Sequence, residues 1–311
     1  MTSGPLVTGV GSLPHPDPGQ AASFVLETTT VPYLPQLPNR HPEERMLVQW
    51  GDGICGCGAI DGSIGLGYGE PVGPRAEAFG GADTLLEVLG DDVPELKTQA
   101  TGPVTLAVGL LAAGHPGDGL LDCVATSLMG RVDEHVAWLA SRLPHTDFTL
   151  IFDEPGLSGL LVPGFPITRE QAGRVLRKVL NAAPARAGIH CCADTDWSVV
   201  VSARPSLISW DINALGAAFL EHAEAIAAAT WEGTGFIWGV VPTQSQPLPA
   251  DLEVRLQRIV GRLVMSGAKM AGLLEGAMFS PGCGLAGLTK GQAEIVARTV
   301  IRLAEELPSY G

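Results

Sequence analysis

Short apolar segments alternate with longer amphipathic segments along most of this chain, and few folds accommodate such a pattern. Most of the short segments are apolar without strict alternation, which is typical of parallel strands that are covered on both faces. Repeated strand–helix units predict an α/β fold, namely a (β/α)8 TIM barrel, with an open doubly wound sheet as the alternative. The candidate strands cover residues 6–11, 31–36, 96–101, 147–153, 186–191, 206–211, 235–241 and 270–276.

The longer segments carry apolar residues at three- and four-residue spacing, which predicts helices packed on the sheet by one face. Thr168 is followed three residues later by Gln171, and Thr289 by Gln292, and this pattern is typical of a capping box at the start of a helix. The expected helices cover residues 118–142, 167–183, 214–229, 248–266 and 287–306.

The chain has 311 residues and no stretch that resembles a linker, so we expect one catalytic barrel over residues 1–311. Residues 37–94 are rich in Gly and Pro, and we expect them to form a long loop insertion, either a lid or a carrier of small extra elements.

The composition narrows the possible partners and the compartment. Lys and Arg total 19 and Asp and Glu total 33, which gives a formal charge of −14 and argues against nucleic acid and anionic membranes as partners. The first residues lack the basic and apolar regions of a signal peptide, and no apolar stretch is long enough to span a bilayer. We therefore expect a cytoplasmic protein whose six cysteines serve metal or redox chemistry rather than disulfides.

Polar side chains follow the predicted strands at the end where parallel barrels carry their active sites. His190 and Cys192 are two residues apart, so on an extended strand both face the barrel mouth while Cys191 faces elsewhere. Together with Cys283 and one carboxylate they form a donor set that suits Zn²⁺. The other polar groups at predicted strand ends are Gly11–Ser12, Asp153–Glu154, Asp211 and Glu275.

A simpler interpretation competes with this one, because free cysteines are among the most buried residues and an H-x-C pair alone is a weak signal. Cys55 and Cys57, in the long loop, have no histidine beside them, and we assign them a structural or incidental role. Cys123 lies in a helical pattern, where we expect a core position.

Six motifs, in order along the chain, resemble the C-terminal catalytic barrel of cobalamin-independent methionine synthase, in a single-barrel form. They are VGSLPH, TGPVTLA, IFDEPGL, GIHCC, SLISWD and SPGCGLAGLT, between about residues 9 and 290. The resemblance implies a (β/α)8 zinc enzyme that methylates the thiol of homocysteine to give methionine.

The resemblance also implies roles for individual residues. His190, Cys192 and Cys283 match the zinc ligands of the family, and Asp211 stands where the family has a glutamate ligand. Asp153 matches the carboxylate that binds the amino group of homocysteine, and Gly11 and Ser12 match the segment that binds its carboxylate. We expect a carboxylate from the long loop to assist with the amino group, and Glu70 is the candidate. His15 and Glu154 are either supporting groups behind the site or surface residues.

The methyl donor is the point at which the chain departs from the family. The second, N-terminal barrel of full-length members, which helps to bind the folate, has no counterpart here, and Gly109 lies near the place of the aromatic residue that stacks on the folate ring. The donor is therefore methyltetrahydrofolate or a methylcorrinoid, the latter free or on a corrinoid protein.

Two other functions remain open. One is uroporphyrinogen-decarboxylase-like chemistry, and the other is a non-catalytic paralogue that zinc braces and that binds a thiol or corrinoid partner.

Overall fold

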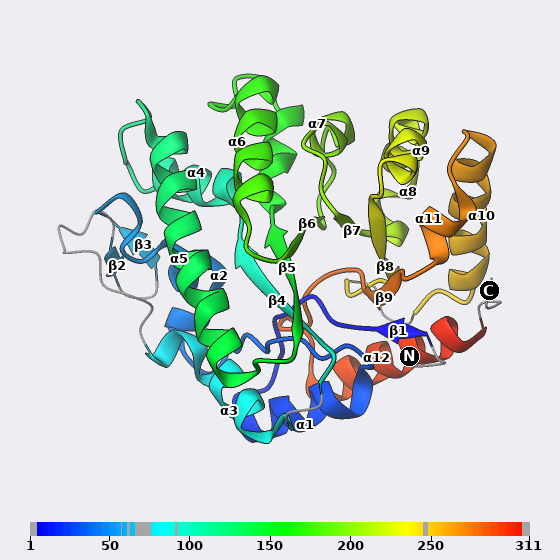
Figure 1. The fold of residues 1–311 in the computed structure, drawn as a ribbon, viewed down its shortest axis with the longest axis horizontal. Coiled ribbons are helices and arrows are strands. Elements are labelled where there is room, and N and C mark those ends of the chain that lie inside the picture. The colour runs from blue at the N-terminus through cyan, green and yellow to red at the C-terminus, as the bar shows by residue number, and fades with distance from the viewer. Residues whose placement is uncertain are drawn as a thin grey trace.

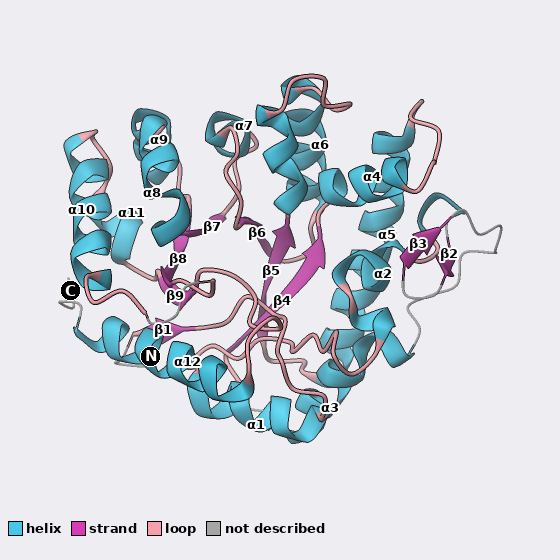
Figure 2. Ribbon diagram, turned by 180° about the vertical axis from the view of Figure 1, so that it is seen from behind, coloured by secondary structure: helices cyan, strands magenta, loops and turns pink. Residues whose placement is uncertain are grey.

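A curled sheet of seven parallel strands forms the centre of the molecule in the computed structural model, which describes residues 5–56, 58–60, 63–65, 76–90, 93–244 and 248–306. Helices surround the sheet on its outer side (Figures 1 and 2). In spatial order the strands are β1 (Leu6–Val7), β9 (Met278–Pro281), β8 (Gly235–Val241), β7 (Leu207–Asp211), β6 (Arg186–Cys191), β5 (Asp147–Asp153) and β4 (Glu95–Thr101). Parallel strands joined by helical crossovers confirm the α/β class that the alternation predicted.

All five segments in which the apolar spacing predicts a helix are helical, and they contain half of the twelve helices found among the described residues. Thr168 and Gln171 form a complete capping box at the start of the helix Arg169–Ala182. Thr289 and Gln292 exchange the same pair of hydrogen bonds before α12. The predicted helix over 214–229 is divided at His222 into α8 and α9. The helices are α1 (Pro18–Thr28), α2 (Met46–Gly51), α3 (Gly80–Val88), α4 (Pro103–Ala112), α5 (Leu120–Arg142), α6 (Arg169–Ala182), α7 (Trp197–Ser202), α8 (Ile212–Glu221), α9 (Ala223–Trp231), α10 (Leu252–Met265), α11 (Met270–Leu274) and α12 (Lys290–Glu306).

Alternate residues of the strands fall into two separate cores, as expected for a curled sheet. The inner core is small and consists of Val31, Ile151, Leu207, Ile237 and Met278, with Leu6 beside them. The outer core lies between strands and helices and takes the intervening residues, such as Phe152 and Trp210. The inner face above the small core is therefore left to polar side chains.

Residues 31–36, predicted as the second strand, make isolated bridges instead of a regular strand. Tyr33 pairs with Lys97 of β4, and Gln36 pairs with Ser12, which follows β1. Two prolines explain the interrupted ladder, since Pro32 and Pro35 have no backbone N–H to donate. The segment still links β4 to the chain after β1, because Lys97 N donates to Pro32 O at 2.8 Å and Gln36 N to Gly11 O at 3.0 Å.

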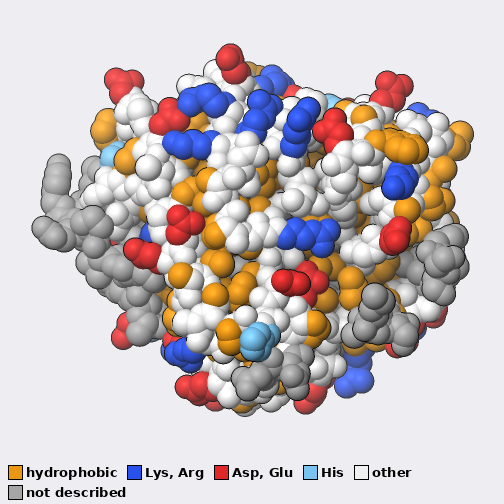
Figure 3. Space-filling view, viewed as in Figure 1, with side chains coloured by type: hydrophobic (Ala, Val, Ile, Leu, Met, Phe, Trp, Pro, Cys, Tyr) orange, Lys and Arg blue, Asp and Glu red, His pale blue; other side chains and the backbone are white. Residues whose placement is uncertain are grey.

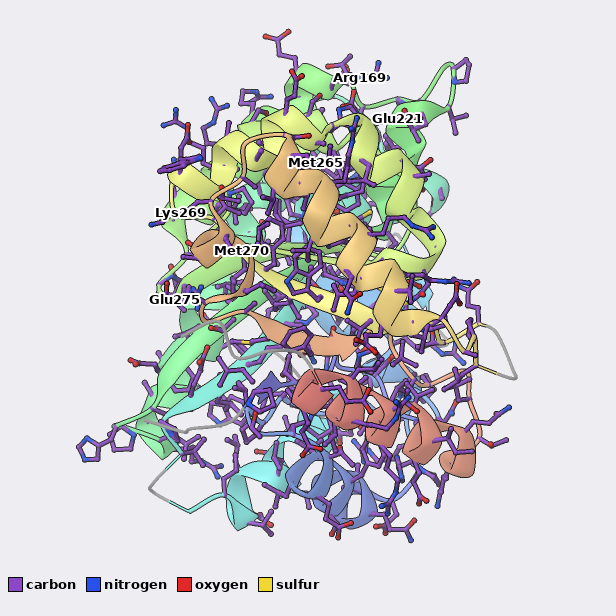
Figure 4. The ribbon with its side chains drawn as sticks, turned by 90° about the vertical axis from the view of Figure 1, so that its right-hand side faces the viewer. Arg169, Glu221, Met265, Lys269, Met270 and Glu275 are labelled. Carbon is purple, nitrogen blue, oxygen red and sulfur yellow. A yellow bond between two sulfur atoms is a disulfide. The ribbon has the colours of Figure 1, made fainter. Side chains whose placement is uncertain are left out.

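The prediction of a strand over 270–276 is wrong. Residues 270–274 form α11, the chain turns at Gly276, whose φ is +68°, and β9 follows. A short apolar run such as MAGLLEG does not distinguish a buried strand from a helix by periodicity. Glu275 is consequently exposed and does not end a strand (Figure 4).

The long loop insertion carries several short elements in its described part, and it is anchored to α5. These are the 3₁₀ helices Pro42–Glu44, Ile54–Gly56 and Ala76–Phe79, the helices α2 and α3, and the antiparallel pair β2 (Gly58–Ile60) and β3 (Ser63–Gly65). The Trp50 ring lies edge-on to the His135 ring of α5, with the two centroids 5.2 Å apart. The Phe79 ring is tilted by 34° to the same His135 ring, with centroids 5.1 Å apart. Arg131 of α5 donates to the carbonyls of Gln49 and Trp50, both at 3.2 Å, at the end of α2.

Cys55 and Cys123 form a disulfide between the loop insertion and α5, with Cα atoms 6.1 Å apart. The expectation of no disulfides is therefore wrong for this pair, and Cys123 lies on the exposed face of α5 rather than in the core. The two cysteines are separated by 68 positions in the sequence, so no local pattern indicated their pairing. Cys57 and Glu70 lie outside the described residues.

The surface mixes charges of both signs (Figure 3). Basic side chains of α6 pair with acidic neighbours, for example Arg174 Nη1 with Asp122 Oδ1 at 2.7 Å. Among the described residues, no helix combines the length and the apolar character that crossing a membrane requires.

Candidate metal centre and substrate site

Three side chains that could hold a metal ion meet at the carboxyl ends of the strands. His190 lies near the end of β6, Cys192 directly follows that strand, and Cys283 lies in the loop after β9. One ligand atom from each lies within 4.8 Å of the other two. Cys191, between His190 and Cys192, belongs to the outer core, as the alternation along a strand requires.

The His190 ring is held by one nitrogen, and its other nitrogen is unpaired. Nδ1 lies 2.9 Å from Ser209 Oγ on β7, and Ser209 is the residue that pairs with His190 in the parallel register. Nε2 is buried without a hydrogen-bond partner. A histidine that is oriented through one nitrogen and leaves the other free is the usual arrangement of a metal ligand. Ser209 was not among the predicted site residues, although its place two residues before Asp211 puts both on the same face.

The two thiols contact each other. A hydrogen bond from the Cys192 thiol lowers the pKa of Cys283 to about 4, with His190 acting in the same direction. The same hydrogen bond, followed by burial, raises the pKa of Cys192. Two neighbouring sulfurs and an unpaired imidazole nitrogen are the donor set that Zn²⁺ prefers, so these residues fit the metal that the motifs imply.

Glycines on both sides of Cys283 let two other predicted site residues approach. A Cβ at Gly282 would collide with the Asp211 carboxylate, and a Cβ at Gly284 would collide with Ser12 Oγ. Leu285 N also donates to Ser12 O at 2.8 Å. The structure therefore brings Ser12 to the loop that carries Cys283.

Asp211 lies beside this loop but outside the group of three ligands. Its Oδ1 accepts hydrogen bonds from Asn213 N at 2.8 Å and Ala214 N at 3.3 Å, so that it caps α8. Burial raises the pKa of Asp211, and the two backbone donors oppose this effect. Its role as a fourth zinc ligand stays a prediction.

Asp153 offers an unpaired carboxylate oxygen beside the candidate metal centre. It ends β5 opposite His190 in the parallel register, and its Oδ1 is buried without a hydrogen-bond partner. Burial raises the pKa of Asp153 to about 6, while His190 and Lys97 act to lower it. The Oδ1 atom lacks a hydrogen-bond partner, and a substrate ammonium would supply one.

Glu154, the next residue, stabilises the fold and does not face the candidate site. It is fully buried, which excludes the surface alternative. Its carboxylate accepts from Val104 N at 2.9 Å, Thr105 N at 2.8 Å and Thr105 Oγ1 at 2.6 Å, at the start of α4. It therefore acts as an N-terminal cap supplied by a neighbouring strand.

Replacing Glu154 with Ala should lower the free energy of unfolding by about 2–4 kcal/mol, because two backbone N–H groups and a hydroxyl lose a buried acceptor. Glu154→Gln keeps one acceptor oxygen and should lose less. Urea unfolding followed by circular dichroism measures both values, and an Ala variant as stable as the original protein would contradict the capping role.

Two solved structures match this chain almost from end to end. The B12-independent methionine synthase from Shewanella sp. W3-18-1, solved in complex with selenomethionine, is 13% identical with a TM-score of 0.66, over 98% of this chain and 97% of that one. The putative vitamin-B12-independent methionine synthase from Listeria monocytogenes is 14% identical with a TM-score of 0.61, over 95% of each chain. This chain has the fold of these methionine synthases. No family model and no curated protein matches its sequence.

The structural match covers at least 95% of each chain in both comparisons. Of the residues that the motifs suggested, His190, Cys192 and Cys283 come together in the structure, whereas Glu70 lies outside the described residues. Sequence reasoning missed Ser209 and Lys97. Both are polar residues inside apolar strands, and strand alternation alone could have placed them on the inner face.

Proposed function

We propose that this protein is a zinc-dependent thiol S-methyltransferase that converts homocysteine to methionine, on a (β/α)8 barrel in which residues 31–36 take the place of the second strand. The observation that carries the proposal is the group of His190, Cys192 and Cys283 at the carboxyl ends of the strands. The fold shared with two methionine synthases supports the same reaction. His190 Nε2 and the two sulfurs would hold the zinc, and Asp211 is proposed as the fourth, exchangeable ligand. When bound, zinc would lower the pKa of a substrate thiol so that it is a thiolate at neutral pH.

The other site residues bind and orient the amino acid. Asp153 would accept the substrate ammonium through its unpaired Oδ1. The backbone at Gly11 and Ser12 would hold the substrate carboxylate. Because Ser12 packs against Gly284, next to Cys283, an amino acid held there has its side chain beside the three ligands. Such positioning turns a reaction between two dissolved molecules into one between aligned groups.

The transfer forms one bond and breaks one bond. The homocysteine sulfur bonds to the methyl carbon as the bond between that carbon and the donor breaks, and the electron pair of the broken bond stays on the donor. For a reduced folate the leaving nitrogen then takes a proton, whereas for a methylcorrinoid the pair stays on cobalt. The donor is methyltetrahydrofolate or a methylcorrinoid, and we propose no further partner.

An assay of methionine formation from homocysteine tests the proposal directly. The donors to compare are methyltetrahydrofolate, its polyglutamate and methylcobalamin. We expect methionine with at least one donor, loss of activity when zinc is removed by a chelator, and recovery when zinc is returned. Absence of methionine with every donor, in protein shown to contain zinc, would refute the proposed function.

A further inference from the structure

Lys97 is a basic residue in the interior of the molecule, and none of the roles in the proposed reaction falls on it. It lies in the middle of β4 with only 2% of its surface exposed. Other basic side chains gather on the surface (Figure 3), and Lys97 is the only buried Lys or Arg among the residues whose side chains are described. Since burying an ammonium group costs several kcal/mol unless it is paired, its surroundings indicate what it is for.

The hydrogen bonds of Lys97 lead to the segment that is proposed to hold the substrate carboxylate. Nζ donates to Val10 O at 2.7 Å, one residue before Gly11 and Ser12, and lies 3.4 Å from Gln99 Oε1. Gln99 in turn packs against Gly11 and donates through Nε2 to Leu34 O at 2.9 Å. A single ammonium therefore holds the backbone before Ser12 and the amide side chain that supports it.

Lys97 and Asp153 carry opposite charges and lie near each other. Both side chains border the same narrow space on the inner face, which is too small for a water molecule, together with His190 and Ser209. Burial lowers the pKa of Lys97 to about 8, and the charge of Asp153 opposes this shift, so Lys97 is cationic at neutral pH. Asp153 Oδ1 has no hydrogen-bond partner, so the two charges do not neutralise each other through that atom.

A positive group toward Gly11–Ser12 and a negative group at the end of β5 match the two charges of an α-amino acid. We propose that Lys97 is a positioning residue of the amino-acid site, which fixes the backbone of residues 10–12 and supplies the positive potential that favours the substrate carboxylate. The inference rests on the proposed function and deepens it. The positive charge of Lys97 would make the site selective for thiols that are zwitterionic amino acids over thiols without a carboxylate.

The test compares three ligands by isothermal titration calorimetry on zinc-loaded protein. L-Methionine carries both charges, methylthiobutanoate lacks the ammonium, and methylthiopropylamine lacks the carboxylate. Lys97→Met keeps the length of the side chain and removes its charge and its donors. We expect it to weaken methionine and methylthiobutanoate about 10- to 100-fold, as for the loss of hydrogen bonds to a charged group, and to leave methylthiopropylamine within about twofold.

Several controls separate positioning from damage to the fold. Thr149→Val changes the residue that pairs with Lys97 in β5, which is buried and bonded to Glu95 below the site, and it should change none of the three affinities. Zinc content and thermal unfolding are measured for each variant. Lys97→Gln, which keeps a donor and loses the charge, provides the measurement if Lys97→Met does not fold.

Equal weakening of all three ligands, or of none, would overturn the role of Lys97 while the proposed function stands. If the original protein binds none of the three ligands, the proposed function itself fails, and the inference fails with it. The two failures are therefore distinguished by the original protein alone.

Discussion

Replacing Cys283 with Ser should remove most of the zinc from the purified protein, and replacing Cys192 with Ser should do the same. A hydroxyl is a far poorer zinc ligand than a thiolate, and each of these sulfurs supplies one of three ligands that converge within 4.8 Å. Loss of an outer-shell partner alone lowers metal affinity by 10–100-fold, so the loss of a ligand should exceed about 100-fold. Elemental analysis, followed by competition with a chelator, gives the zinc content and the affinity, and we expect close to one zinc per chain in the original protein.

Cys191→Ser is the matched control for both variants. Cys191 is adjacent to Cys192 but belongs to the outer core, where its Sγ lies 3.1 Å from Ala193 O and burial raises its pKa to about 12. It should keep its zinc. If the Cys192 and Cys283 variants retain as much zinc as Cys191→Ser, the ligand assignment is wrong, and the proposed function loses the observation that carries it.

The strands covered on both faces were the most predictable part of the fold. The strands that were predicted over 147–153, 186–191 and 235–241 have the same bounds in the structure. Burial on both faces selects continuous β-branched and aromatic residues, and such runs are visible in a single sequence. Segments in which prolines interrupt the ladder, or where a short apolar run suits either element, lack that signal. Residues 31–36 and 270–276 are of these two kinds.

The candidate site was predictable only in part. Alternation along β6 placed His190 and Cys192 on one face, but the approach of Cys283 depends on the pairing of β1, β8 and β9. No local pattern encodes that pairing, and the expectation came from the ordered motifs. Strand alternation could have placed Ser209 on the inner face, but its contact with His190 depends on the register between β6 and β7. Lys97 looks like an ordinary polar strand residue, because a sequence does not show which way a long side chain points or how deeply its charge is buried.

Replacing Asp153 with Asn should lower kcat/KM for homocysteine by about 10²- to 10³-fold. One oxygen of the Asp153 carboxylate, Oδ1, is buried and unpaired on the strand next to His190, so it would make its strongest interaction with the substrate ammonium. Breaking a buried ion pair by neutralising one partner costs about 3–5 kcal/mol, and each 1.4 kcal/mol is tenfold. Steady-state kinetics with homocysteine as the varied substrate measures the effect, and the zinc content should not change.

The matched control is Asp147→Asn, at the exposed first residue of the same strand, and it should leave kcat/KM unchanged. Asp153→Asn should also weaken methylthiopropylamine and spare methylthiobutanoate, which is the reverse of the pattern expected for Lys97→Met. Opposite patterns would mean that Lys97 interacts with the substrate carboxylate and Asp153 with the substrate ammonium. If Asp153→Asn keeps full kcat/KM, or weakens both analogues equally, Asp153 does not bind the amino group, and the orientation of the substrate in the site has to be reversed or abandoned.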